Sequence, residues 1–179
     1  GDALTEGFGN VPLGYSALSS DTLGKRSVAI GHQALLNQNF TSVTDVFNTA
    51  VGYGAGAAVT TGKENTLIGG LAGVSITSGT QNVIIGNLAG DALTDADSNV
   101  AVGYSALTTD TKGGRAVAIG QFALNNQNFS TTTNSYNVGV GYNAGVSVTT
   151  GVQNTLIGGL AGDALTDADY NVAVGVGAL

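Results

Sequence analysis

Few side chains in this chain of 179 residues could carry out catalysis. The sequence has no Cys and a single His, His32, whose counterpart in a later copy of the same repeat is Gln121. A nucleophilic mechanism would need a Cys or a Ser/His/Asp set, and neither is available. Paired carboxylates for glycoside cleavage would have to come from Asp residues in repeated turns, where no cleft is expected. We therefore expect no catalytic residues and no enzymatic activity.

Two groups of Asp residues could supply the oxygen ligands that Ca²⁺ prefers. They are Asp91, Asp95 and Asp97, which recur as Asp163, Asp167 and Asp169. The glycine-rich nonapeptide of calcium-binding solenoids is absent, as is the EF-hand loop with its closing Glu. Solvated turns are therefore the favoured interpretation, and we predict no metal and no cofactor.

Two polar segments that contain aromatic residues, 37–47 and 126–136, are the candidate binding sites. Aromatic rings stack on sugar rings, while amide groups bond sugar hydroxyls. The candidate receptor- or glycan-binding residues are Asn39, Phe40, Asn128, Phe129 and Tyr136. In the alternative interpretation, Phe40 and Phe129 only pack the segments against the rest of the protein. A further set of tyrosines could bind a glycan or pack at an edge, namely Tyr15, Tyr53, Tyr104 and Tyr142.

A short repeat must position these segments. Ten copies of an apolar triplet followed by Gly are spaced by 17 residues, or by 21 where the two polar segments add four residues. The pattern returns after 89 residues, which gives two super-repeats, 1–89 and 90–179. A fixed short period predicts a solenoid. We expect an all-β, parallel β-solenoid of ten coils that runs continuously over residues 1–179.

The apolar triplet predicts how each strand is oriented. Counted from the central Gly, position −1 is a large aliphatic residue, position −3 is Val or Thr, and position −2 is also apolar. We expect positions −1 and −3 to face the inside of the coil and position −2 to face outward. Because a strand that is apolar on both faces is covered on both, position −2 should contact another copy of the chain. The predicted interface is Ala29, Ala50, Leu67, Ile84, Ala101, Ala118, Leu156 and Ala173.

Three other features limit the function. The formal net charge of −7 makes nucleic acid an unlikely partner, because an acidic surface repels phosphates. No apolar run approaches eighteen residues, so no membrane insertion is expected. The chain begins and ends inside a repeat, which we interpret as a segment of a longer fibre.

The repeated strings resemble those of a known family of fibres. Ser27-Val28-Ala29-Ile30-Gly31 and Asn48-Thr49-Ala50-Val51-Gly52-Tyr53 are similar to the head repeats of YadA-like trimeric autotransporter adhesins, and more so to repeats of phage tail fibres. The resemblance covers nearly the whole chain. It implies a left-handed parallel β-roll in which three chains pack side by side around a common axis.

These observations predict a structural and adhesive role outside the cell. We expect a homotrimeric shaft or head segment of a phage tail fibre, which spaces or presents surfaces that bind a host glycan or protein receptor. The alternatives are a bacterial trimeric surface adhesin and, from another class, a monomeric ice- or mineral-binding solenoid. The last of these would need Thr in register along one face, whereas position −3 mixes Thr with Val.

Overall fold

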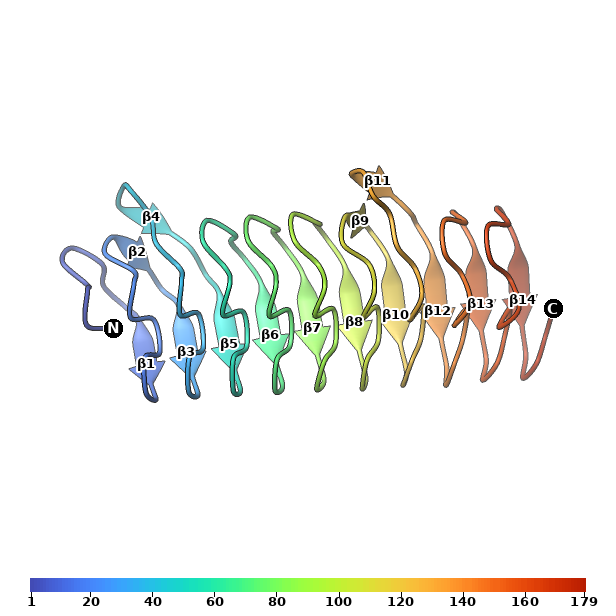
Figure 1. Ribbon diagram of the computed structural model, residues 1–179, viewed down its shortest axis with the longest axis horizontal. Helices are drawn as coiled ribbons and strands as arrows, with labels where there is room; N and C mark the ends of the chain where they lie inside the picture. The colour runs from blue at the N-terminus through green and yellow to red at the C-terminus, as the bar shows by residue number, and fades with distance from the viewer.

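The protein is a parallel β-solenoid with no helix, and a computed structural model describes residues 1–179 (Figure 1). Ten three-residue strands, one per coil, lie side by side in one sheet. They are β1 (Val11–Leu13), β3 (Val28–Ile30), β5 (Thr49–Val51), β6 (Thr66–Ile68), β7 (Val83–Ile85), β8 (Val100–Val102), β10 (Val117–Ile119), β12 (Val138–Val140), β13 (Thr155–Ile157) and β14 (Val172–Val174). The predicted all-β class, parallel solenoid and number of coils are confirmed.

The strands pair in strict register, so that equivalent residues of successive coils form columns. Ile84 of β7, for example, is the partner of Leu67 in β6 and of Ala101 in β8. The strands lie in the sheet in the order in which they follow along the chain, as Figure 1 shows. No helix is present that could span a membrane.

Two small parallel sheets lie on the upper side of the solenoid in Figure 1, where β4 and β11 extend beyond the neighbouring coils. The first joins β2 (Gly24–Lys25) to β4 (Thr44–Asp45), and the second joins β9 (Gly113–Gly114) to β11 (Thr133–Asn134). Strands β4 and β11 belong to the two segments that the 21-residue spacing lengthens. We call residues 37–47 the first protrusion and residues 126–136 the second protrusion.

The predicted direction of the strand side chains is wrong. Position −2 faces the inside of the solenoid, where its side chains are fully or almost fully buried: Ala29, Ala50, Leu67, Ile84, Ala101, Ala118, Leu156 and Ala173. Positions −1 and −3 point outward instead and are half-buried or exposed. The residues predicted to contact another chain therefore form the core of their own chain.

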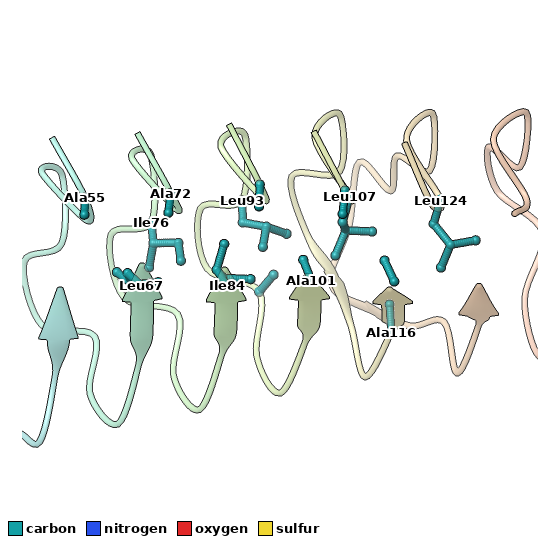
Figure 2. Close-up of a cluster of buried hydrophobic side chains, with 14 of the residues drawn as sticks. Ala55, Leu67, Ala72, Ile76, Ile84, Leu93, Ala101, Leu107, Ala116 and Leu124 are labelled. Atoms are coloured by element: carbon teal, nitrogen blue, oxygen red, sulfur yellow. The ribbon is translucent and has the colours of Figure 1, made fainter. Parts of the chain in front are cut away.

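The volume available inside a coil explains this orientation. Three coils carry Leu or Ile at position −2, and in these coils position +4 is Gly and position +7 is apolar. Figure 2 shows two of them, in which Leu67 faces Ile76 and Ile84 faces Leu93 across the coil. Where position −2 is Ala101, position +4 is the larger Leu107. The interior is thus filled by small and large side chains that complement each other, as close packing requires. The side chains at positions −1 and −3 point away from the coil, so no opposite side of the coil limits their size.

Stacked asparagines at position −4 bind the coils together. Asn82 donates from Nδ2 to Asn65 Oδ1 at 3.1 Å and to the Ala96 carbonyl at 2.9 Å, and its own Oδ1 accepts from the Asn99 amide at 2.9 Å. The side chain is fully buried. Because each amide group satisfies polar groups of two other coils, the asparagines form a ladder along the solenoid.

The central glycines are required where successive coils approach most closely. Gly86 has a φ of +138°, and a Cβ on it would lie 2.4 Å from the Gly103 carbonyl oxygen of the next coil. An L residue would be strained in this conformation and would also collide with backbone atoms. This explains why the same residue type recurs in all ten coils.

Candidate functional site

A buried carboxylate holds the base of each protrusion. In the first, Asp21 Oδ2 accepts from Gln38 Nε2 at 2.6 Å and Asp21 Oδ1 accepts from the Gly24 amide at 3.0 Å. Gln38 also accepts from Asn48 at 2.9 Å, which connects the protrusion to the asparagine ladder. All of these side chains are fully buried. The protrusion therefore emerges from a fixed polar base.

The second protrusion repeats this base. Asp110 Oδ2 accepts from Gln127 Nε2 at 2.6 Å, and Asp110 Oδ1 accepts from the amides of Gly113 and Phe129 at 2.9 and 3.2 Å. The sequence analysis missed Asp21 and Asp110 and the glutamines bonded to them. A signal was present, because these polar residues stand at position +7, where the coils with Gly at position +4 carry an apolar side chain.

The two phenylalanines that were predicted to contact a ligand are buried. Phe40 and Phe129 are only 7% and 6% exposed, so they pack each protrusion against the solenoid and cannot stack on a ligand. This is the alternative that the sequence left open. Asn39 and Asn128 are exposed, and each accepts a hydrogen bond from a Thr hydroxyl, Thr22 in the first case and Thr111 in the second.

The exposed rings of the protrusions stand beside arginines. Phe47 is 50% exposed and Tyr136 is 49% exposed. The Arg26 guanidinium carbon lies 5.5 Å from the centre of the Phe47 ring, and that of Arg115 lies 5.7 Å from the Tyr136 ring. Of the predicted binding residues, Tyr136 is thus accessible, and the structure adds an arginine that the sequence analysis did not single out.

A second surface is the outward face of the ten-stranded sheet. Its two columns consist of aliphatic residues and Thr, and Ile68, Ile119 and Ile157 are 37–40% exposed. Apolar exposure continues past the sheet at position +1, where all four of the predicted tyrosines are exposed. Tyr15, His32 and Tyr53 stack there, with ring centroids 5.2 and 5.4 Å apart. Exposed apolar side chains gathered in this way are typical of an interaction site.

The Asp residues considered as calcium ligands serve the turns. Asp95 accepts from the Thr94 hydroxyl, and Asp97 accepts from the amide and hydroxyl of Thr80. No three His, Cys, Asp or Glu residues come together in a group that could hold a metal ion. Burial raises the pKa of the Asp91 carboxyl above its ordinary value of 3.8, although its backbone hydrogen bonds act in the opposite direction.

The chain has no pocket of the kind that encloses a small substrate. The candidate interaction surfaces are the two protrusions and the outward sheet face. No family model, curated protein or solved structure matches this chain.

Proposed function

We propose that this chain is a segment of a homotrimeric extracellular fibre, in which the outward sheet faces of three solenoids pack against one another. The observation that carries the proposal is the composition of that face, which is aliphatic at position −1 in all ten coils and Val or Thr at position −3. A soluble chain that exposes such a face gains free energy by covering it, since apolar burial is worth about 25 cal/mol per Å².

Another copy of the chain is the partner that fits best. The face repeats every coil in strict register, so an identical chain aligned alongside would match it coil by coil. Past the sheet, at position +1, four coils also expose a tyrosine. A surface that extends past the sheet in this way can contact two neighbours. This supports three chains around an axis, the arrangement that the resemblance to tail fibres and YadA-like heads implies.

The role of such a fibre is mechanical and multivalent. Its coils would form a stiff rod, and the protrusions would be displayed three times around the axis. Weak contacts to a host surface then add through avidity. The phage tail fibre is the setting we propose, and a bacterial surface adhesin would use the same assembly.

The experiment that tests the assembly is sedimentation equilibrium over a range of protein concentrations. We expect a mass of three times the 17.6 kDa chain. A variant with Ile68→Asp and Ile85→Asp should lose the assembly, because both side chains face outward in the middle of the sheet. The matched control, Thr61→Asp with Ser78→Asp, adds the same charge at exposed turn positions and should remain assembled. A monomer of the unmodified chain would refute the proposal, and a dimer would refute its threefold form.

A further inference from the structure

The two protrusions differ in the charge around their arginines. Arg26 Nη1 lies 2.7 Å from Asp45 Oδ2, and both side chains are exposed. Eighty-nine residues later, Arg115 takes the place of Arg26, while Asn134 takes the place of Asp45. Arg115 forms no ion pair in the structure, and its Nη1 donates instead to the Tyr136 hydroxyl at 2.9 Å. One protrusion thus neutralises its arginine internally and the other does not.

A second carboxylate has been replaced in the same region. Glu64 stands in the coil after the first protrusion, and its counterpart in the later super-repeat is the neutral Gln153. The preceding coil carries two acids whose side chains have other partners, and the carbonyl oxygen of one of them, Asp97, accepts from the Arg115 amide at 3.1 Å. Asp95 lies 3.9 Å from Lys112 Nζ, and Asp97 accepts two hydrogen bonds from Thr80. The guanidinium of Arg115 is therefore exposed and lacks a carboxylate partner.

We propose that the second protrusion binds the carboxylate of an acidic sugar through Arg115. Asp45 shows that a carboxylate can pair with the arginine of this repeat, and a planar guanidinium binds carboxylates with two parallel hydrogen bonds. The exposed Tyr136 ring offers a face for the sugar ring, and the exposed amide of Asn134 offers donors and an acceptor for its hydroxyls.

A sugar acid fits this surface better than an acidic peptide. The exposed groups beside Arg115 include the Tyr136 ring, whose hydroxyl accepts from its guanidinium, and the amide of Asn134, a residue that pairs with the neighbouring Gly114 in the small sheet. No pocket is present that would bury a peptide side chain. The inference names acidic glycans as the class of receptor. It rests on the proposed function, because a binding site for a host glycan has a role only if the chain belongs to an extracellular fibre.

The test is an NMR titration of the full chain with three probes. These are a uronic-acid oligosaccharide, the same oligosaccharide with its carboxyl groups reduced, and a sialylated oligosaccharide. We expect the uronate, the sialoside or both to bind at one site per chain, and the reduced sugar to bind at least about tenfold more weakly, since the charge-assisted hydrogen bonds are lost. The two acidic probes distinguish the source of the carboxylate.

The super-repeat supplies matched variants for this titration. Arg115→Ala should abolish binding, and Asn134→Asp should weaken it to a similar extent, because the new carboxylate would pair with Arg115 as Asp45 pairs with Arg26. Arg26→Ala should leave binding unchanged. Asp45→Asn should raise the number of sites from one to two per chain. Each of the two exchanges introduces the residue type that the other protrusion already carries.

Four results would overturn the proposal. They are no binding of either acidic probe, equal binding of the carboxyl-reduced sugar, binding that survives Arg115→Ala, and equally tight binding of polyglutamate, which would indicate an acidic peptide surface. The mass of each sample, measured by sedimentation, separates this inference from the proposed assembly. A trimer without sugar binding would refute the site alone, and a monomer that binds the sugar would refute the assembly alone.

Discussion

Neighbouring residues of the same strand are equally apolar yet lie in different surroundings. Leu67 of β6 is fully buried inside the solenoid, whereas Ile68, the next residue, is 37% exposed on the outward face. The inward column is limited in size by the opposite side of its own coil. The outward columns contain Leu, Ile, Val or Thr in every coil. The difference teaches that one apolar triplet can serve two purposes, folding of the chain and, in the assembly proposed above, contact with a partner.

The comparison is tested most strongly by placing the same charge on either side of β6. Leu67→Asp puts a carboxylate into a fully buried apolar site and should prevent the chain from folding. Ile68→Asp should leave the secondary structure intact but weaken the assembly. Circular dichroism and sedimentation together distinguish the two outcomes. Equal loss of folded protein in both variants would show that the two faces do not have separate roles.

The next largest effect should follow from a methyl group at the central glycine. In Gly86→Ala the added Cβ would collide with the Gly103 carbonyl oxygen and would hold an L residue at a φ of +138°. We expect a loss of about 3 kcal/mol or more in the free energy of unfolding, measured by chemical denaturation. Gly70→Ala is the control, because its Cβ would meet only the flexible Asn87 side chain at 3.0 Å. If both variants were equally stable, close packing of the coils would not depend on the central Gly.

Adjacent amide side chains extend the comparison to polar groups. Asn82 lies inside the ladder, while Gln81 is exposed and donates to Glu64 at 3.0 Å. Asn82→Ala leaves buried partners unsatisfied and should lower the free energy of unfolding by about 1–3 kcal/mol. Gln81→Ala should change it by no more than about 0.5 kcal/mol. The same denaturation measurement would contradict the account if the order were reversed.

The smallest expected effect concerns a partly buried acid. Oδ1 of Asp91 is buried and has no hydrogen-bond partner, and burial raises the pKa of its carboxyl above 3.8. In the pH range between 3.8 and the raised pKa, the folded chain binds more protons than the unfolded chain. The contribution of Asp91 to stability therefore falls as the pH rises through this range.

The variant Asp91→Asn removes this dependence. At neutral pH it should be as stable as the unmodified chain or more stable by no more than about 0.5 kcal/mol. Its advantage should shrink as the pH falls towards 3.8. Thermal melts of both chains over this range give the measurement. A variant that loses stability relative to the unmodified chain as the pH rises would show that the sign is wrong.

The sequence predicted the parts of the fold that depend on spacing. The 17-residue period predicted the coils and their parallel strands. The sequence did not predict which side chains of each strand point into the coil, because positions −1 and −2 are both apolar and position −3 is Val or Thr. That choice depends on the volumes that meet across a closed coil, such as Ala101 with Leu107, and these pairings become visible only when the coil is built.

The candidate site was predicted in its position but not in its chemistry. The two 21-residue spacings located both protrusions. Phe129 is buried and Tyr136 is exposed, a difference that the composition of the segment does not reveal. Arg115 lies outside the inserted segment in the sequence and reaches Tyr136 only because successive coils stack, 21 residues apart. Contacts of this kind depend on which residues the stacked coils bring side by side, and the local sequence pattern does not reveal this.

The central claim is that the outward sheet face is covered in the assembled protein. Because the chain has no Cys, a single introduced thiol reports on one position. We would measure the rate at which a maleimide labels Val102→Cys on the outward face and compare it with Ser78→Cys in an exposed turn. The account predicts that Val102→Cys is protected at concentrations where the chains assemble and becomes reactive on dilution to the monomer. Labelling of both thiols at the same rate in the assembled state would contradict it.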